Sequence, residues 1–451
     1  MPSFGEGVRV WSRIATLSFG GPAGQIAVMH RTLVEEKRWI SESRFLHALN
    51  YCMLLPGPEA QQLVTYVAWL LHGTGAAILA GSLFVLPGFV SILALSLLYV
   101  SFQDVAIVQA LLYGLKPAVM AIVVEAVIRI GKRALKGRFA LALAAAAFVA
   151  IFLYDVPFPV VVGGAAVLGL LNARLGAGAR IAGAELLAPE AALDDPDVPI
   201  IDRLAPRAVP TLGRTLRVVA ICLALWWLPV ALVAAWCGPD STLAQLGVFF
   251  SKAAVVTFGG AYSVLAYVAQ QAVEVNHWLT PKEMLDGLGM AETTPGPLIQ
   301  VVQFVAFLAG HRNAGGLPPV GSAIAASVLT TWVTYVPCFL FILVGAPFVE
   351  SLRRSRALSG ALSAITAAVV GVVLNLAAWF SIHTLFGRVG EVRALGMHVL
   401  IPDPATLDIA GLIIAVAAGV AVLRYKAGML PTLAASMAAG LVVRLLLGGG
   451  V

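Results

Sequence analysis

The chain has 451 residues, of which 60% are hydrophobic and 12% are charged, whereas an ordinary soluble domain has about 45–50% apolar and about 25% charged residues. Its 29 Lys and Arg exceed its 23 Asp and Glu, for a formal net charge of +6, and its mean hydropathy is +0.93. A soluble fold cannot cover so much apolar surface, because its exterior needs charged residues. The composition therefore excludes a soluble enzyme or a nucleic-acid-binding protein, and it predicts an all-α polytopic integral membrane protein whose partner is the lipid bilayer.

Six apolar segments occupy the first 175 residues, and a transmembrane helix needs about 20 such residues. They cover residues 14–30, 45–71, 76–102, 105–130, 139–153 and 156–171. The first contains Gly20-Gly21 and the second contains Pro56-Gly57-Pro58. Because Gly and Pro interrupt regular helical hydrogen bonding, neither segment is expected to be one straight helix.

The composition changes after residue 175. Residues 176–216 are rich in acidic residues and proline, which predicts a solvated linker. A strongly apolar run over 218–236 follows, and six more segments begin near residues 246, 284, 321, 358, 407 and 430. The predicted organisation has about 12–13 transmembrane segments: a first repeat over 1–175, a linker over 176–216, and an extra helix with a second repeat over 217–451.

An internal repeat relates the two halves. Ser18-Phe19-Gly20-Gly21 recurs as Thr257-Phe258-Gly259-Gly260, and Pro56-Gly57-Pro58 recurs as Pro295-Gly296-Pro297. Both pairs of motifs are 239 residues apart, and no gap is needed between them. Chance is a poor explanation for two rare motifs at one spacing, so the halves are interpreted as homologous.

Single residues extend this repeat. The 239-residue spacing relates Gln61 to Gln300, and farther along the spacing becomes 250 and relates Pro87 to Pro337 and Arg174 to Arg424. Six segments in each half and one extra span between them would turn the second half upside down. The sequence therefore predicts inverted repeats with broken helices, an arrangement that many transporters use.

Basic residues favour one orientation in the membrane. The N-terminus, the loop over 129–138 and the linker fall on one side of a thirteen-span chain, as do the basic loops over 353–356 and 424–426. Positive loops are typical of the cytoplasmic side, so the N-terminus and the linker are predicted to be cytoplasmic. The cluster over 31–44 disagrees, because simple counting puts it outside, unless the Gly-Gly segment is a hairpin that never crosses.

The broken segments are the candidate substrate site. Gly-Gly pairs let the chain leave helical geometry and free backbone N–H groups, which a bound anion can satisfy. The alternative is close helix packing at glycine. Cations beside these motifs would suit a divalent oxyanion, although a cation near a membrane surface also sets topology. The candidate substrate-binding residues are Arg13, Ser18, Gly20, Gly21, Gln61, Lys116, Lys252, Thr257, Gly259, Gly260 and Gln300.

A second set of residues is predicted to break helices and to couple transport to protons. Each Pro-Gly-Pro removes two backbone donors, and it acts either as a hinge or as part of the site. Glu59 and Glu292 adjoin these breaks and are candidate proton carriers, because ionisable groups inside membranes are often functional. Ion pairs with Lys116, Arg13 or Lys252 are the alternative. The set is Pro56, Gly57, Pro58, Glu59, Glu292, Pro295, Gly296 and Pro297.

No cofactor or metal site is expected. The four cysteines are scattered and are interpreted as packing residues, and the seven histidines lack metal-ligand spacing. The sequence contains neither a phosphate-binding Walker loop nor a Gly-x-Ser-x-Gly elbow. ATP-driven transport and hydrolysis therefore have no motif, and the chain is not predicted to be an enzyme.

Several of these motifs together resemble the chromate ion transporters, bacterial inner (plasma) membrane proteins, here of the long two-domain type. They are Ser18-Phe-Gly-Gly-Pro-Ala-Gly24, Leu55-Pro-Gly-Pro-Glu-Ala-Gln61, Gly114-Leu-Lys-Pro-Ala118, Thr257-Phe-Gly-Gly260 and Glu292-Thr-Thr-Pro-Gly-Pro297. The resemblance covers essentially the whole chain and implies export of chromate, a sulfate-like oxyanion, powered by the proton-motive force, with chromate resistance as the result. Gly260 is followed by Ala261-Tyr262 where the first motif has Pro-Ala, so the two halves are not expected to contribute equally.

The membrane potential agrees with export. An inside-negative potential drives a dianion outward by roughly 4.6 kcal/mol per 100 mV, twice the value for a unit charge. The charges of Lys252 and Lys116 and the paired helix breaks lead to a separate expectation, that Lys252→Ala or Lys116→Ala abolishes chromate efflux without preventing membrane insertion. The alternative function is transport of another oxyanion such as sulfate, including proton-coupled uptake, and a membrane-embedded enzyme or scaffold is a third. The sequence does not determine the oligomeric state.

Overall fold

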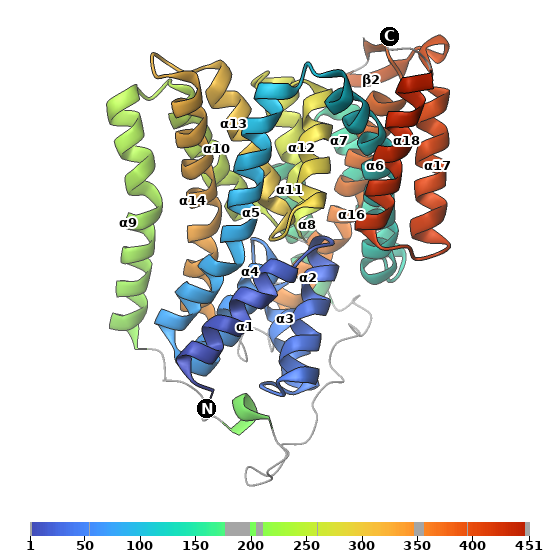
Figure 1. The fold of residues 1–451 in the computed structure, drawn as a ribbon. Helices are drawn as coiled ribbons and strands as arrows, with labels where there is room; N and C mark the ends of the chain where they lie inside the picture. Colours follow the sequence, from blue (N-terminus) through green and yellow to red (C-terminus); the bar gives the residue numbers. More distant parts are fainter. Residues whose placement is uncertain are drawn as a thin grey trace.

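The computed structural model describes residues 2–53, 55–175, 199–203, 211–258, 260–346, 356–394 and 396–446. Within these residues it is a helical membrane protein with one short β-hairpin (Figure 1). Six helices are long and apolar enough to cross a membrane: Thr74–Phe102, Ala106–Ala134, Leu212–Cys237, Pro319–Gly345, Gly360–Leu385 and Met429–Leu446. Five shorter apolar helices accompany them, so the all-α polytopic fold is confirmed.

The first half begins with two helical hairpins and continues with longer helices. Its elements are α1 (Phe4–Leu17), α2 (Gly21–His30), the π-helix η1 (Arg31–Glu36), α3 (Glu42–Cys52), α4 (Glu59–His72), α5 (Thr74–Phe102), α6 (Ala106–Ala134), α7 (Arg138–Tyr154) and α8 (Phe158–Arg174). The chain turns at Gly20-Gly21 between α1 and α2, and at Pro56-Gly57-Pro58 between α3 and α4. The prediction that neither segment is one straight helix is confirmed.

The second half repeats this order after one additional helix. Its elements are η2 (Ile200–Arg203), α9 (Leu212–Cys237), α10 (Thr242–Val256), α11 (Ala261–Ala269), η3 (Gln270–Val275), α12 (Pro281–Thr293), η4 (Leu298–Gln300), α13 (Val301–Arg312), α14 (Pro319–Gly345), α16 (Arg356–Leu385), β1 (Val389–Ala394), β2 (Met397–Pro402), η6 (Pro404–Thr406), α17 (Ile409–Leu423) and α18 (Met429–Leu446). Most of the predicted linker over 176–216 lies outside the described residues.

The broken helices lie at opposite ends of the molecule in the two halves. The hairpins α1–α2 and α3–α4 lie toward the end that holds the N-terminus, whereas α10–α11 and α12–α13 lie toward the other end (Figure 1). Their turns meet near the middle of the molecule. The π-helices η1 and η3 are 239 residues apart, the same spacing as the glycine and proline motifs.

The repeat has one insertion that the sequence comparison missed. The spacing of 250 holds from α6 to α16, after which the antiparallel hairpin β1–β2 follows in the second half alone among the described elements. By element order α8 therefore corresponds to α18, and Arg174 corresponds to Arg444. The pairing of Arg174 with Arg424 was wrong, because a constant spacing cannot pass through an insertion.

The two halves are packed into each other. Helix α6 contacts α17 and α18, while α16 contacts α7 and α8 of the first half, which are the corresponding elements. In the same way α4 contacts α14, and α5 contacts α13. Each half therefore completes the core of the other.

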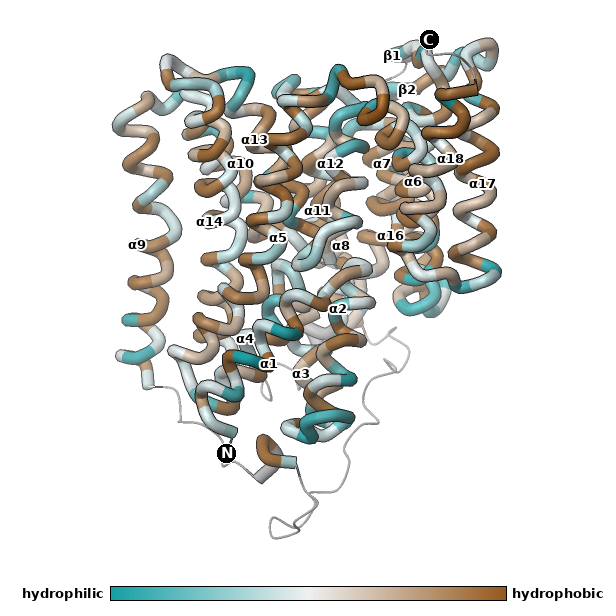
Figure 2. Tube along the Cα trace, viewed as in Figure 1, coloured by the Kyte–Doolittle hydropathy of each residue, from teal (hydrophilic) through white to brown (hydrophobic). Residues whose placement is uncertain are grey.

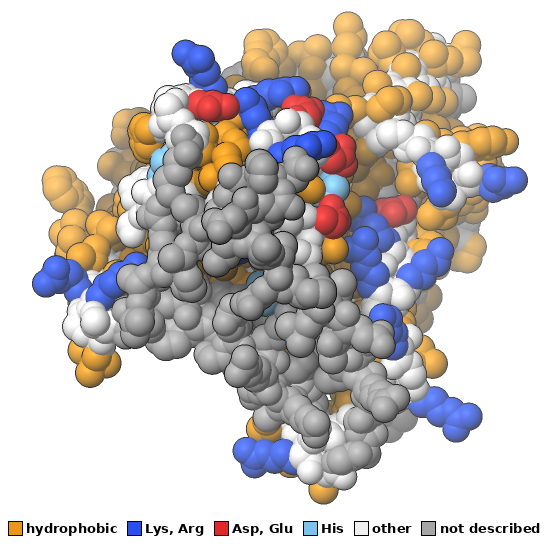
Figure 3. Space-filling model, turned by 90° about the horizontal axis from the view of Figure 1, so that it is seen from below, with side chains coloured by type: hydrophobic (Ala, Val, Ile, Leu, Met, Phe, Trp, Pro, Cys, Tyr) orange, Lys and Arg blue, Asp and Glu red, His pale blue; other side chains and the backbone are white. Residues whose placement is uncertain are grey.

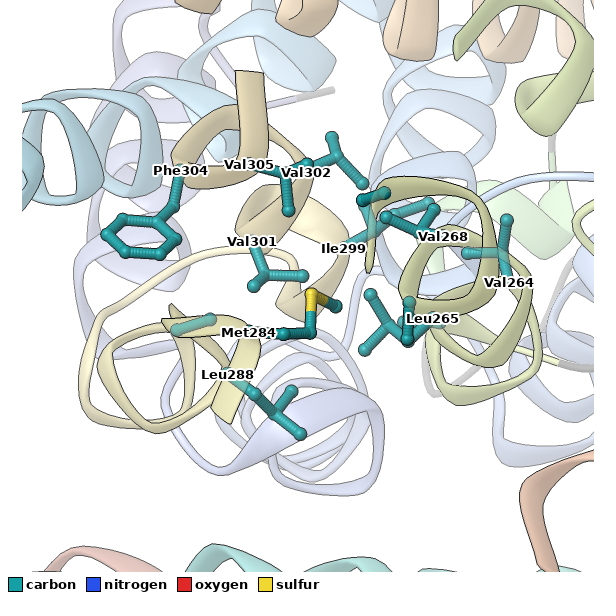
Figure 4. Packing of buried hydrophobic residues seen from close by; sticks show 14 of the residues in the cluster. Val264, Leu265, Val268, Met284, Leu288, Ile299, Val301, Val302, Phe304 and Val305 are labelled. Atoms are coloured by element: carbon teal, nitrogen blue, oxygen red, sulfur yellow. The ribbon is translucent and has the colours of Figure 1, made fainter. Parts of the chain in front are cut away.

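The core lies around the broken helices. Val264, Leu265 and Val268 of α11 pack near Met284 of α12 and Ile299 of η4 (Figure 4). Large apolar side chains also remain on the outside, where the long helices are strongly hydrophobic (Figure 2). An exterior of this kind fits lipid rather than water.

The basic cluster over 31–44 lies at the same end as the N-terminus. Lys37 Nζ is 2.8 Å from Glu6 Oε1 of α1, and Arg44 donates to the carbonyl of Ile201 in η2 at 2.9 Å. The count that put this cluster on the opposite side was wrong, because the Gly-Gly segment turns back instead of crossing. The alternative of a hairpin is the one that the geometry supports.

An ion pair between the largely buried Glu283 and the partly exposed Arg312 fixes the start of α12. Thr280 and Glu283 form a capping box, and Arg312 Nη1 donates to Glu283 Oε2 at 3.0 Å. Burial opposes ionisation of Glu283, but the hydrogen bonds from Arg312 and Thr280 outweigh it and lower its pKa below the ordinary value. The α12 helix is in this way tied to the end of α13.

Candidate functional site

The helix breaks of one half are completed by the other half. The backbone N–H of Gly57 donates to the carbonyl of Thr257 at 2.8 Å, and the N–H of Gly296 donates to the carbonyl of Ser18 at 2.9 Å. Donors and acceptors in these two bonds are each 239 residues apart. The four motifs found in the sequence therefore meet at one centre, where each half contributes one donor and one acceptor.

Two long helices pack closely on this centre. A side chain at Gly88 of α5 would bring its Cβ to 2.9 Å from the carbonyl oxygen of Pro295. A side chain at Gly57 would bring its Cβ to 2.8 Å from Cys338 Sγ of α14. Both distances are too short for a carbon atom to be added without movement. The break at Pro295 is therefore held against α5 of the first half, and the break at Gly57 is held against α14 of the second half.

Four helix N-termini face the centre without side-chain caps. They are those of α2, α4, α11 and η4, which begin after Gly20, Pro58, Gly260 and Pro297. Gly20 and Gly260 have φ of 89° and 95°, a conformation that only glycine adopts without strain. Uncapped N-termini present free N–H groups and the positive end of the helix dipole, so the centre suits an anion.

Two buried glutamates lie across the centre from these glycines. Glu292 accepts a hydrogen bond from the Tyr262 hydroxyl at 2.6 Å, and the site of a Cβ on Gly21 is 3.9 Å from its other oxygen, Oε2. Among the described residues Oε2 has no hydrogen-bond partner. Glu59 Oε1 lies 3.3 Å from the site of a Cβ on Gly260. The carboxylates of Glu59 and Glu292 therefore each lie beside a glycine that begins a helix in the other half.

Three buried amides surround the breaks. Gln61 and Gln300 each donate to a threonine hydroxyl, Thr65 at 3.2 Å and Thr331 at 3.1 Å. The Oε1 atom of each has no hydrogen-bond partner within the described part of the chain. Gln25 of α2 donates to the carbonyl of Gly296 at 2.6 Å. Gln25 thus joins α2 to the second proline break, and Gln300 joins η4 to α14. Two of the amide oxygens, on Gln61 and Gln300, stay unpaired among the described residues.

A basic pocket of about 520 Å³ leads to this centre. Gly20 and Tyr262 of the centre line this pocket, together with Arg129 of α6. Arg129 is 3.6 Å from Glu125, and it interacts electrostatically with both Glu59 and Glu292. Lys132, Arg133 and Lys426 also line the pocket. Figure 3 shows Lys and Arg side chains spread around this end of the molecule, with fewer Asp and Glu.

The three cations that the sequence suggested are elsewhere. Arg13 forms an ion pair with Glu36 at 2.9 Å and is half exposed. Lys116 lies 3.2 Å from Asp286, and Lys252 is exposed on the surface of α10. None of them forms an ion pair with Glu59 or Glu292 among the described residues, so the predicted alternative of such ion pairs was wrong. The sequence could not decide this, because the packing of a helix determines which of its faces points to the centre.

The other predicted residues lie at or next to the four motifs that meet at the centre. Gly259 lies outside the described residues. Sequence reasoning missed Tyr262, Arg129 and Gln25. Tyr262 had a signal, since it stands where the first repeat has Ala23. Arg129 was counted as a charge that sets topology, although it lines the pocket.

The described residues contain no group of three or more His, Cys, Asp or Glu side chains placed to hold a metal ion. All four cysteines are free; Cys52, Cys222 and Cys338 are buried, and Cys237 is exposed. The site is therefore built from helix ends, amides, carboxylates and cations.

Comparison with known proteins finds one family in both halves of the chain. The family described as chromate transporter matches residues 6–170 and 244–442, one match in each half. A chromate transport protein of Cupriavidus metallidurans is 30% identical over 371 residues, covering 81% of this chain and 80% of the relative. One from Pseudomonas aeruginosa is 32% identical over 365 residues, covering 80% and 77%. A probable chromate transport protein of Synechococcus elongatus is 25% identical over 407 residues, covering 89% and 92%. No solved structure matches the chain.

Proposed function

Because the chain belongs to the chromate transporter family, we propose that it exports chromate across the bacterial inner membrane by secondary active transport and so confers chromate resistance. The N-terminus and the linker lie in the cytoplasm in this proposal. Relatives of similar length are chromate transport proteins, which supports the substrate. The basic end of the molecule supports the orientation, since positive residues favour the cytoplasmic side.

One observation carries the proposal. The hydrogen bonds Gly57 to Thr257 and Gly296 to Ser18 bring four uncapped helix N-termini to one buried centre. Helix N-termini that end inside a membrane protein are used to bind anionic substrates. We assign substrate binding to this centre, including Gly21, Gly260, Gln61 and Gln300.

We also infer that the two halves are inverted repeats that move relative to each other. The positions of α1–α4 and α10–α13 at opposite ends of the molecule support this arrangement (Figure 1). In such transporters the substrate site lies between the repeats and becomes accessible from each side in turn. The Pro-Gly-Pro breaks, held between the halves, are the expected hinges.

Glu59 and Glu292 are the proposed proton carriers. Both are buried, at 9% and 1% exposure, and both lie beside glycines that begin a helix in the other half. Each proton carried with chromate would cancel one of its charges and lower the electrical drive by about 2.3 kcal/mol per 100 mV. A proton carried in the opposite direction would raise the drive by the same amount.

The test is chromate movement into everted membrane vesicles with the potential and the pH gradient imposed separately. We expect accumulation driven by a lumen-positive potential, reduced by Glu59→Gln or Glu292→Gln, with normal amounts of protein in the membrane. Sulfate and molybdate as competitors measure how far the site distinguishes oxyanions. Wild-type vesicles that accumulate no more chromate than empty vesicles would overturn the proposed function.

A further inference from the structure

The basic pocket has a counterpart near the opposite end of the molecule. A second cavity, of about 30 Å³, is lined by residues of α7, α11, α16 and the β-hairpin. Its volume is enough for about one water molecule, whereas the basic pocket has about 520 Å³. The cavity at the basic end is therefore much the larger of the two.

The two cavities occupy corresponding places in the repeat. Glu125 and Arg129 of α6 line the basic pocket, and Asn375 and Trp379 of α16 line the small cavity. These residues are 250 residues apart, the spacing that relates α6 to α16. The Arg129 cation of one pocket is thus replaced by the Trp379 indole in the other.

The charges of the two cavities are opposite. Arg129, Lys132, Arg133 and Lys426 line the basic pocket with one carboxylate, that of Glu125. The small cavity is lined by Asp155, Glu274 and His398, and by no Lys or Arg among the described residues.

His398 of β2 does not make the small cavity basic. Its Nδ1 is 2.9 Å from Asp155, and its Nε2 is 3.3 Å from Glu391 of β1. Trp379 of α16 and Glu274 of η3 line the same cavity. Carboxylates therefore face the histidine from the α7–α8 turn and from its own hairpin.

We propose that the basic pocket is an oxyanion-binding vestibule that only the proposed cytoplasmic face has, with Arg129 as the residue that gives this face its higher affinity for the substrate. The inference rests on the proposed function. Opposite charges raise the local concentration of a dianion at one mouth, and like charges lower it at the other. Among the pocket cations of α6, Arg129 lies farthest from the C-terminal end of the helix, and it lines the pocket together with Gly20 and Tyr262 of the centre, so it is placed to hold the anion next to the centre.

The sidedness concerns affinity and not the direction of net flux. A difference in affinity between two faces must be balanced by the equilibrium between the two conformations, because no free energy is gained around a closed cycle. The vestibule thus lowers the concentration at which the cytoplasmic face is half-saturated, and the membrane potential still sets the direction.

The experiment compares initial rates of chromate entry from each face as a function of concentration. Everted vesicles present the basic face, and right-side-out vesicles present the other, each driven by a potential that is positive in the lumen. For the wild type we expect half-saturation at a lower concentration in everted vesicles, by about tenfold, as the loss of one charge-assisted contact would give.

Substitutions at the pocket then identify Arg129. Arg129→Gln should raise half-saturation about tenfold in everted vesicles and leave right-side-out vesicles unchanged, and Arg129→Lys should restore most of the affinity. Glu125→Gln removes the opposing charge and should lower half-saturation. If the ion pair between Glu125 and Arg129 had only a structural role, Glu125→Gln would raise the half-saturating concentration as much as Arg129→Gln does.

Lys136→Gln with Arg138→Gln is the matched control, because both residues lie at the same end of the molecule and neither lines the pocket. It should leave half-saturation unchanged. The inference would be overturned if the wild type reached half-saturation at the same chromate concentration from both faces, or if Arg129→Gln left that concentration unchanged. In either case, chromate flux in the wild type would still support the proposed function. Absence of flux in the wild type would overturn both.

Discussion

Removing the Tyr262 hydroxyl tests whether the buried centre is built as described. Within the described residues this hydroxyl donates the one hydrogen bond that Glu292 receives, at 2.6 Å, and the side chains are 3% and 1% exposed. Tyr262→Phe keeps the ring and leaves a buried carboxyl group without a donor. Leaving a buried acceptor without its donor costs about 1–3 kcal/mol, so we expect the free energy of unfolding to fall by about that amount.

Tyr335→Phe is the matched control. Tyr335 is buried to a similar extent, at 4% exposure, but its hydroxyl has no hydrogen-bond partner among the described residues. Replacing an unpaired polar group by an apolar one is neutral or stabilising. The two variants therefore remove the same atom with opposite expected results.

The assay is chemical unfolding of the purified variants in one detergent, with chromate flux measured in parallel. We expect Tyr262→Phe to lose both stability and flux, and Tyr335→Phe to keep both. Equal unfolding free energies for the two variants would refute the reasoning, because they would mean that the contact between Tyr262 and Glu292 contributes nothing.

Three further results are expected. Lys252→Ala should keep most of the chromate flux in everted vesicles, since Lys252 lies on the exposed surface of α10; loss of flux would return it to the site. Gly88→Ala should lower the free energy of unfolding by about 1–3 kcal/mol through overpacking, because its Cβ would lie 2.9 Å from the carbonyl oxygen of Pro295. Gly75→Ala on the same helix is the control and should be neutral, since its Cβ would meet nothing within 4 Å. Equal melting temperatures for the two variants would contradict this. Burial opposes ionisation of Glu283, but Arg312 keeps its pKa below the ordinary value. The stability that this pair adds is therefore present at neutral pH and is lost as pH falls below about 4.3, the ordinary pKa of Glu. The melting temperature of Glu283→Gln should lie below that of the wild type at pH 7, and the two values should converge in acid.

The sequence was sufficient to determine the class of protein and the location of its breaks. Composition alone required a lipid-facing exterior, because so few charged residues cannot cover a protein of this size. Gly20-Gly21 and the two Pro-Gly-Pro motifs interrupt helices for local reasons, the freedom of glycine and the missing donors of proline. The 239-residue spacing then related the halves before any contact between them was known.

Only the tertiary structure decided which side chains face the centre. Lys252 lies close to a motif in the sequence but on the outer face of α10, whereas Arg129 is far from every motif and lines the pocket that ends at Gly20. The difference arises because a cation is placed by the direction in which its helix packs, and α6 packs against α17 and α18 of the other half. Local sequence specifies where a helix must break, but the contacts between the repeats specify what the broken ends face.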